Sequence, residues 1–407
     1  MSRHKLVFSA LVFCVGLTGF LSAGDSGVNS KISGFIKFDD YFDNRQVVSA
    51  REGHFLLYPK AVDRNAQGDD VNDVFTTNMV SFQTRLRLNI AAPDVQSAKV
   101  TGLIECDFFG TSNGNENELR LRHAFIKMDF GSHQHQFGQY WSPLFTTAVY
   151  PQVVSFNTGV PFQPFARNPQ VRSTMQIGKA LTIYIASTMQ RDAYQEIGGR
   201  VKQQMSGIPG LHAHAELGNA NTLIGGGGHI RTIRPADSAD VFTSTVLTAY
   251  GKIIGPKLAV RGKVIYGGDM ADQLMLGGYA AITDATNGVT EYKPLNNLSA
   301  WLDVMTTGKT ISMGIFAGYS TNLGLSSDIS GTDIYSLASS RSPNIADLWR
   351  VSPRFIRNAG KLRFAVEIEI TSALYTSGYE SNLAPKELAS DERVTNIRGL
   401  FATYLFF

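Results

Sequence analysis

Strict alternation of apolar and polar residues limits the folds that this chain can adopt. In segment 80–90 the even positions run Val, Phe, Thr, Leu, Leu and Ile, whereas the odd positions include Arg85 and Arg87. A period of two residues places these two sets on opposite faces of a β-strand. A shift of one residue would bring both arginines onto the apolar face, so the register is well defined. Segments 98–109 and 362–371 repeat the pattern, which is expected of a strand between lipid and water.

About sixteen such segments follow one another along the chain. Short, turn-forming connections such as 255–256 and 360–361 alternate with mostly longer ones such as 43–78 and 267–297. Short periplasmic turns and long extracellular loops are the arrangement of outer-membrane barrels. The expected strands are 31–42, 79–91, 98–109, 119–130, 134–141, 171–177, 181–190, 211–217, 223–232, 241–250, 258–266, 298–306, 311–320, 348–356, 362–372 and 394–407.

The N-terminal segment has the layout of a secretory signal peptide. Arg3 and Lys5 precede an apolar run over 6–21, which ends on small residues, so we predict cleavage after Ala23. The barrel domain is then 24–407. No other stretch approaches the roughly 20 apolar residues that a spanning helix needs. A membrane-embedded chain must therefore form a closed barrel, because lipid provides backbone groups with no hydrogen-bond partners.

The last strand supports the same conclusion. Ile397, Phe401, Leu405 and Phe407 share one parity, so this strand is similar to the closing strand of bacterial outer-membrane β-barrels. The opposite parity places Arg398 on the inward face. We predict an all-β fold, a transmembrane antiparallel barrel of about sixteen strands in the bacterial outer membrane. A soluble sandwich would also alternate, but it would not explain the regular change between short and long connections.

Composition excludes several function classes. Removing residues 1–23 leaves 37 − 2 = 35 basic residues against 34 acidic ones, so nucleic-acid binding gains no support. Cys106 is then the single cysteine, which excludes an internal disulfide and a cysteine-based metal site. No cofactor is expected. His212, His214 and Glu216 alternate on one strand, but no second pair of ligands is placed beside them, so lumen lining is favoured over a metal site.

Three function classes remain open. The first is a porin, a water-filled channel for passive diffusion of small hydrophilic solutes. The second is a surface protein acting mainly as an adhesin or antigen, with loops 43–78 and 267–297 meeting a host. The third and least supported is an outer-membrane hydrolase, because no Gly-x-Ser-x-Gly run or other nucleophile motif occurs. We therefore expect no enzymatic activity.

Arginines recur at inward positions. Arg85 and Arg87 share the polar face of the second strand, and Arg120 and Arg122 repeat that spacing on the fourth. Guanidinium binds carboxylate or phosphate through a planar fork, so a ladder of arginines favours small anions. The alternative is that the arginines only pair with lumenal carboxylates. The pore-lining candidates are Arg85, Arg87, Arg120, Arg122, Arg167, Arg172, Arg354 and Arg398, and the alternative partners are Asp39, Glu105, Asp107, Glu367 and Glu369.

The connection 142–170 follows the fifth strand, where sixteen-stranded porins fold their third loop inward to narrow the pore. It contains no Asp or Glu and many apolar residues. A constriction loop without carboxylates predicts a positive potential at the narrowest point. Its apolar character predicts packing on the wall or on a neighbouring subunit.

Three successive motifs resemble those of DcaP-like outer-membrane porins, and in part those of phosphate-selective porins. They are Leu119-Arg120-Leu121-Arg122-His123-Ala124-Phe125, Gly138-Gln139-Tyr140-Trp141-Ser142-Pro143 and Arg167-Asn168-Pro169-Gln170-Val171-Arg172. The resemblance implies a homotrimer of sixteen-stranded barrels in outer-membrane lipid that passes small anionic solutes such as dicarboxylates. By position, it assigns the pore-lining role to Arg120, Arg122, Arg167 and Arg172.

Overall fold

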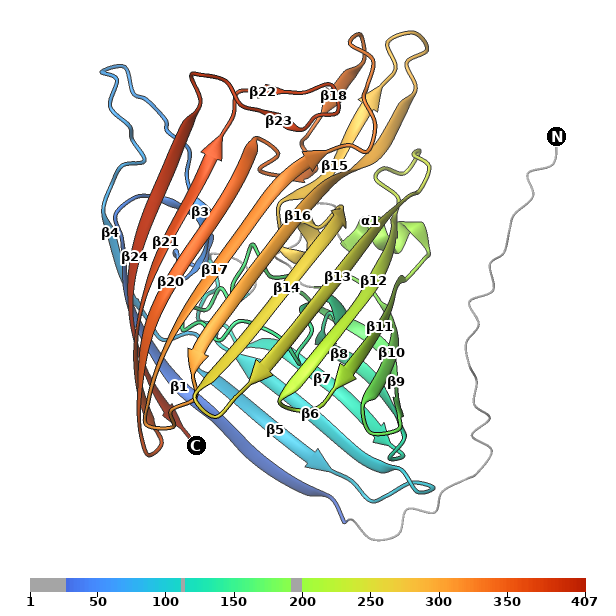
Figure 1. Cartoon of the computed structure of the whole chain (residues 1–407). Helices are drawn as coiled ribbons and strands as arrows, with labels where there is room; N and C mark the ends of the chain where they lie inside the picture. The colour runs from blue at the N-terminus through green and yellow to red at the C-terminus, as the bar shows by residue number, and fades with distance from the viewer. Residues whose placement is uncertain (1–26, 111–113, 192–199) are drawn as a thin grey trace, which may run out of the picture.

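The sixteen segments predicted from alternation each form part of one closed antiparallel barrel (Figure 1). The computed structural model describes residues 27–110, 114–191 and 200–407, so the predicted signal peptide 1–23 lies outside the described residues. The ring closes where the first strand pairs with the last, with Lys37 opposite Tyr404. The predicted fold class is therefore confirmed.

The wall consists of sixteen strands, each hydrogen-bonded to its neighbours in chain order, and β4 (Thr76–Val80) extends the second of them along β1. They are β1 (Asn29–Asp43), β5 (Arg85–Ala91), β6 (Lys99–Asp107), β7 (Arg120–Asp129), β8 (His133–Trp141), β9 (Arg167–Ile177), β10 (Leu181–Thr188), β11 (Gly210–Gly218), β12 (Thr222–Ile233), β13 (Phe242–Ile254), β14 (Leu258–Gly268), β16 (Thr290–Thr306), β17 (Ile311–Gly324), β20 (Ile345–Ala359), β21 (Leu362–Tyr375) and β24 (Glu392–Phe406).

The long connections carry short elements of their own. Figure 1 shows most of them at one end of the barrel, and the short turns and the C-terminus at the other. They are β2 (Val47–Ala50), β3 (Phe55–Pro59), η1 (Pro143–Phe145), α1 (Arg200–Ser206), η2 (Ala271–Gln273), β15 (Gly277–Thr283), β18 (Ile334–Ser336), β19 (Ser340–Arg341), β22 (Gly378–Tyr379) and β23 (Pro385–Lys386). No helix among the described residues is long and apolar enough to cross a membrane.

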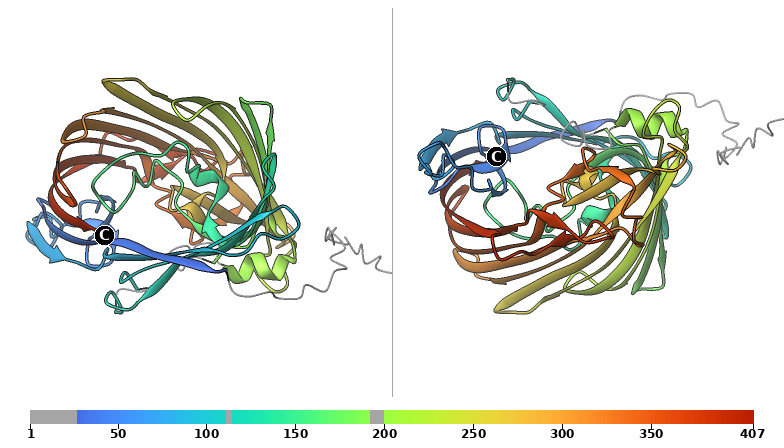
Figure 2. Two further views of the ribbon diagram at one scale, coloured as in Figure 1. Left: turned by 90° about the horizontal axis from the view of Figure 1, so that it is seen from below. Right: turned by 90° about the horizontal axis from the view of Figure 1, so that it is seen from above.

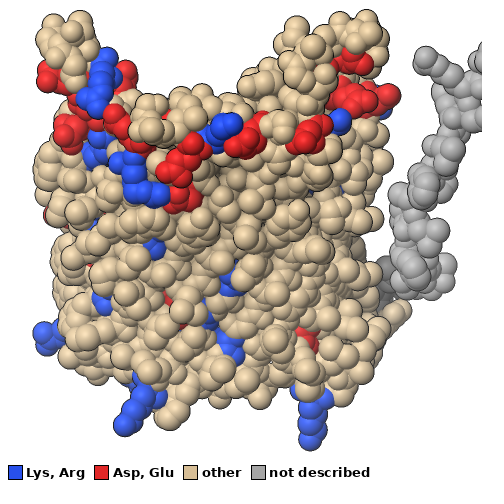
Figure 3. All heavy atoms as spheres, turned by 45° about the horizontal axis from the view of Figure 1, so that its top comes forward, with Lys and Arg blue, Asp and Glu red and all other residues tan. Residues whose placement is uncertain are grey.

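The alternating residues of the strands lie on the two faces of the wall, with the apolar side chains outside and the polar ones inside. In β24, Ile397, Phe401 and Leu405 are 41–42% exposed, whereas Arg398 between them is 1% exposed. Figure 3 shows the same division from outside, with a broad uncharged band below a rim of charged loop residues. An apolar band on the outer surface is what a strand wall needs in contact with lipid.

A β-bulge in β7 changes which side chains face inward. The register between β6 and β7 shifts at Glu105/Cys106, so Glu105 lies opposite His123 and Cys106 lies opposite Leu121. Arg122 is the extra residue of the bulge, and both Arg122 and His123 are buried at 2% exposure. Simple alternation places Arg122 inward but cannot place His123 beside it.

Three segments fold into the lumen (Figure 2). Loop 142–166, which joins β8 to β9, lies inside the barrel as the sequence predicts. The β2–β3 hairpin packs against it, with the Phe55 and Phe165 ring centroids 5.2 Å apart. Segment 269–276 contacts the same loop, since the Phe165 amide donates to the Gln273 carbonyl at 2.9 Å. The expectation that all of 43–78 is an outer loop was therefore wrong for its hairpin, whose apolar residues are buried in the lumen.

Candidate functional site

A cavity of ≈ 500 Å³ remains between loop 142–166 and the inner wall. We call it the neck cavity. Its charged lining among the described residues is Arg85, Arg87, Arg122, Arg363 and Glu105. Four guanidinium groups therefore meet one carboxylate, and the excess of fixed positive charge favours anions there.

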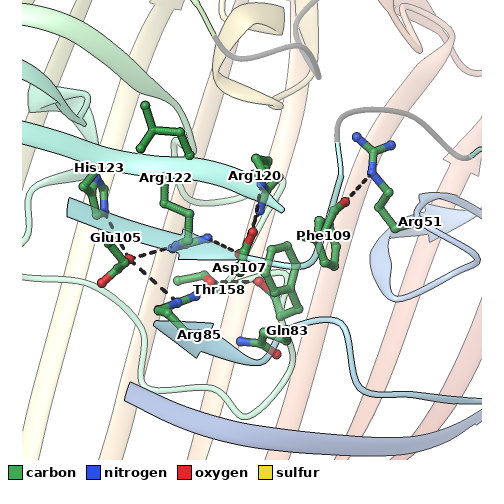
Figure 4. A network of polar contacts seen from close by, with 12 residues as sticks. Arg51, Gln83, Arg85, Glu105, Asp107, Phe109, Arg120, Arg122, His123 and Thr158 are labelled. Carbon is green, nitrogen blue, oxygen red and sulfur yellow. Dashed lines mark hydrogen bonds and ion pairs between the residues drawn. The ribbon is translucent and has the colours of Figure 1, made fainter. Parts of the chain in front are cut away.

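Two carboxylates on β6 anchor the most deeply buried arginines of this wall (Figure 4). Arg120 grips Asp107 with two hydrogen bonds of 3.0 Å. Arg122 bridges the two carboxylates, at 2.9 Å from Glu105 and 2.9 Å from Asp107. Bidentate and bridging geometry holds these side chains rigidly. Here the pairing alternative from the sequence is the better description, because both guanidinium groups are neutralised within the wall.

Arg85 and Arg87 differ from this buried pair because they meet open space. The Arg87 side chain is 45% exposed and donates to Glu105 at 2.9 Å, and the Arg85 side chain is 20% exposed with its Nε 3.7 Å from the same carboxylate. Glu105 is thus shared by three arginines, since Arg122 also binds it. Asp107 also neutralises Arg122, but Glu105 cannot neutralise Arg85 and Arg87 together, so net positive charge faces the cavity.

The remaining residues implied by the family resemblance lie beside aromatic rings. Arg167 is 2% exposed, with its guanidinium carbon 5.4 Å from the centroids of both Trp141 and Phe165. Arg172 donates to the Gln170 side chain at 3.1 Å and lies 5.0 Å from the Tyr184 ring. The aromatic faces hold both side chains through cation–π contacts.

Arg354 and Arg398 are drawn into ion pairs on the other part of the wall. Arg354 Nη2 lies 2.6 Å from Asp303, and Arg398 contacts Asp43 at 2.9 and 2.6 Å. Arg398 does point inward, as its parity predicts, yet each of the two guanidinium groups has a carboxylate within 2.6 Å. Their partners Asp303 and Asp43 were not among the carboxylates named from the sequence, and a role in solute passage stays a prediction.

Basic wall residues hold loop 142–166 by its carbonyl groups. Lys263 Nζ donates to the Leu144 and Phe145 carbonyls at 2.7 and 3.0 Å. Arg350 donates to the Val160 carbonyl at 2.8 Å and to the Leu57 carbonyl of the β2–β3 hairpin at 2.7 Å. Arg350 therefore ties two in-folded segments to the wall.

Acidic wall residues hold the same loop by its amide groups. The Val154 amide donates to Glu367 at 2.5 Å, the Asn157 side chain to Glu369 at 2.6 Å, and the Gln152 amide to Asp303 at 3.1 Å. The loop contains no carboxylate of its own, and the wall carboxylates that it binds do not line the neck cavity. This arrangement supports the positive neck predicted from the loop composition.

The β2–β3 hairpin is anchored by a buried charge pair. His54 Nε2 lies 2.8 Å from Asp39, and Lys37 Nζ lies 3.0 Å from the same carboxylate. Burial lowers the pKa of His54 below its usual range, although the Asp39 carboxylate opposes the shift. The hairpin thus narrows the lumen with an uncharged imidazole near neutral pH.

Arg363 is a neck residue that the sequence places on the inner face without marking it as special. Its Nε donates to Asn358 at 2.9 Å, and its guanidinium carbon lies 5.2 Å from the Phe406 ring. No carboxylate lies within 4.0 Å of it among the described residues. Its parity with Glu367 is the only sequence signal, and tertiary structure alone brings it into the cavity that Arg85 lines.

The histidine strand does not form a metal site. His212 and His214 are buried on β11, and Glu216 accepts a hydrogen bond from Tyr250 at 3.0 Å. No group of three or more His, Cys, Asp or Glu side chains in the described part of the chain could hold a metal ion. His212 and His214 alternate with the exposed Ala213 and Ala215, so they lie on the inner face of β11.

No family model matches the chain, and no curated protein matches it. Among solved structures, the outer membrane channel DcaP of Acinetobacter baumannii matches with a TM-score of 0.69 at 15% identity, over 94% of this chain and 98% of that chain. OmpT of Vibrio cholerae matches with a TM-score of 0.54 at 9% identity, over 95% and 99% of the two chains. OmpF of Salmonella typhi, solved with daunomycin, gives 0.53 at 8% identity over 93% and 97%. The chain therefore has the fold of outer-membrane channel proteins.

Proposed function

We propose that the protein is an outer-membrane porin, a water-filled channel through which small hydrophilic solutes diffuse passively, with preference for small anions such as dicarboxylates or phosphate. The barrel fold and its apolar outer band support the membrane location. The excess of guanidinium groups in the neck cavity carries the anion preference. Anions there would meet Arg85 and Arg87, whose side chains are the most exposed of the neck arginines that bind Glu105.

The proposed channel is a homotrimer embedded in outer-membrane lipid. One solved form of Vibrio cholerae OmpT, a similar barrel, is described as a trimer. In this proposal, solutes pass along the β5–β7 side of each barrel, because Arg85, Arg87 and Arg122 line the neck cavity there. Crosslinking of the purified protein in detergent, followed by gel analysis, would test the number of subunits.

Current measurements in a planar lipid bilayer test the proposed function. Purified protein should produce discrete conductance steps, and the reversal potential in a KCl gradient should have the sign of chloride preference. A cation-preferring reversal potential would contradict the anion preference while leaving the porin intact. Absence of conductance from folded protein would contradict the porin itself and favour a surface protein.

A further inference from the structure

A second cavity, of ≈ 570 Å³, lies on the inner face of β1 and β5–β9. We call it the basal cavity, because it borders the first residues of β1 at the barrel end that carries the short turns (Figure 1). Its charged lining residues are Lys31, Lys127 and Arg172, and no carboxylate among the described residues lines it. Tyr140 lines both the basal cavity and the neck cavity, so the two adjoin along one side of the barrel.

The register of the wall explains how these cations come together. Lys127 lies opposite Gln136, and Gln136 lies opposite Arg172, so the three form one row across β7, β8 and β9. Neighbouring strands are roughly 4.8 Å apart, which puts the Lys127 and Arg172 backbones about 10 Å apart. Thr101 continues the row on β6, so its hydroxyl supplies a neutral donor beside Lys127, and the Gln136 amide supplies one between Lys127 and Arg172. A small anion fits between two cationic side chains at that spacing.

The cations of the basal cavity are only weakly neutralised. Neither Lys31 nor Arg172 has a carboxylate within 4.0 Å among the described residues. Lys127 Nζ lies 4.0 Å from Asp129, at the limit of an ion pair. Asp129 does not line the cavity and already accepts hydrogen bonds from Gln134 at 2.8 Å and Gly131 at 2.9 Å. The described lining therefore carries a positive charge that Asp129 offsets only in part.

Arg172 is held in place for binding. Its Nε donates to the Gln170 side chain at 3.1 Å, and the guanidinium lies 5.0 Å from the Tyr184 ring and 5.9 Å from the Tyr140 ring. Contacts to neutral groups fix the orientation of a guanidinium while leaving its charge available. Arg120 differs, because the Asp107 carboxylate accepts hydrogen bonds from two of its guanidinium nitrogens.

We infer that the basal cavity is a second anion subsite, which takes a small dianion between the neck cavity and the short-turn mouth. This inference rests on the proposed channel function and deepens it. Two cationic subsites in series along one wall would let an anion move from one to the other, as conduction through weak, multiple sites requires. Lys31 and Lys127 are the residues that the sequence did not single out for this role.

Block of the chloride current by inorganic sulfate tests the subsite. Sulfate is added to each side of the bilayer in turn, and the concentration that halves the current is measured from each side. The triple variant Lys31→Gln, Lys127→Gln, Arg172→Gln should raise the half-blocking concentration from the short-turn side by about tenfold. The matched control Lys257→Gln, Lys309→Gln, Lys361→Gln removes three exposed lysines from other short turns and should change it less than about twofold.

Two single variants keep the test informative if the triple variant folds poorly. Lys31→Gln, at an exposed position, should raise the half-blocking concentration by about twofold to threefold. Asp129→Asn should lower it, because Lys127 loses its nearby carboxylate while the Asn carbonyl oxygen can still accept the hydrogen bond from the Gly131 amide. Unchanged block in the lysine and arginine variants of an anion-preferring channel would overturn the subsite alone. A wild-type channel that shows no conductance would overturn the proposed function and the subsite together.

Discussion

Two parts of the inner wall both carry arginines and carboxylates, but the two parts differ in how far arginine side chains are exposed to the lumen. The neck wall, formed by β5–β7, presents Arg87 at 45% side-chain exposure, whereas the anchoring wall, formed by β16, β20, β21 and β24, presents Arg354 at 0%. On the neck wall three arginines share Glu105, whereas on the anchoring wall Arg354 pairs with Asp303 and Arg398 pairs with Asp43 of the adjoining strand β1. A charged side chain on the inner wall is therefore open to the lumen only where no in-folded loop covers that part of the wall.

The largest effect should come from breaking an anchoring pair. Asp303→Ala would leave Arg354 buried without its 2.6 Å partner and would release the Gln152 amide of the loop. Removing one member of a buried ion pair destabilises by about 3–5 kcal/mol. Unfolding in urea, followed by tryptophan fluorescence in detergent micelles, should show this loss. The control Glu387→Gln changes an exposed loop carboxylate and should leave the midpoint unchanged; equal midpoints for both variants would contradict the anchoring role.

A smaller loss of stability and a change in conductance should follow release of the in-folded segments. Arg350→Gln removes the donors to Val160 and Leu57; because both carbonyls belong to loop segments that can turn towards water once released, we expect a net loss of about 1.5–3 kcal/mol. The loop and the hairpin should loosen, so single-channel currents should be larger and noisier than those of the wild type. Arg357→Gln, on the outward face of the same strand, is the control. If the Arg350 variant gave the same currents as the wild type, contacts other than those of Arg350 would be enough to hold the loop and the hairpin in place.

Neutralising an arginine of the neck wall should change the ion preference and leave the stability of the barrel almost unchanged. Arg87→Gln should lower the chloride preference, because the most exposed neck guanidinium is lost, and should change stability by no more than about 1 kcal/mol. Reversal potentials and urea midpoints measured on the same samples would separate the two effects. The control Arg64→Gln alters an exposed ion pair with Glu392 in the loop region. If the Arg87 and Arg64 variants gave the same reversal potential as the wild type, the neck wall would not set selectivity.

The smallest effect should be the salt dependence of selectivity. Exposed fixed charges are screened over about 10 Å at 0.1 M salt and about 3 Å at 1 M salt. The chloride preference of the wild type should therefore fall as salt rises, and the fall should be smaller in the Arg87→Gln variant. Reversal potentials at a constant concentration ratio and rising mean concentration give the comparison. A preference independent of salt would indicate selection by pore size rather than by charge.

Most strands of the barrel could be predicted, because the pattern that marks them lies within short stretches of sequence. A two-residue period decides which side chains face lipid, and it correctly placed Ile397 and Phe401 outside and Arg398 inside. The β7 bulge is the exception, since it inserts Arg122 and brings His123 inward without a clear mark in the sequence. The β2–β3 hairpin was also missed, because its apolar residues give no sign of whether they pack inside the lumen or outside the barrel.

The candidate site was only partly predictable. The sequence identified arginines at inward positions and the carboxylate-free loop, and it named Glu105 and Asp107 as possible partners, which they are. It could not rank the arginines, because exposure depends on which wall the loop covers. It placed Arg363 on the inner face, but it could not show that Arg363, Lys31 and Lys127 line cavities, since that depends on how distant segments pack.

The sequence by itself determined the strands, their two faces and the inward placement of the charges, because these follow from spacing along one chain. Only the tertiary structure decided which charges are free. Arg398 meets Asp43 and Arg354 meets Asp303 across long stretches of sequence, whereas Arg85, Arg87 and Arg363 share one cavity with a single carboxylate. Neutralisation is a property of distances in space, and those are fixed by barrel closure and by the loops packed inside it.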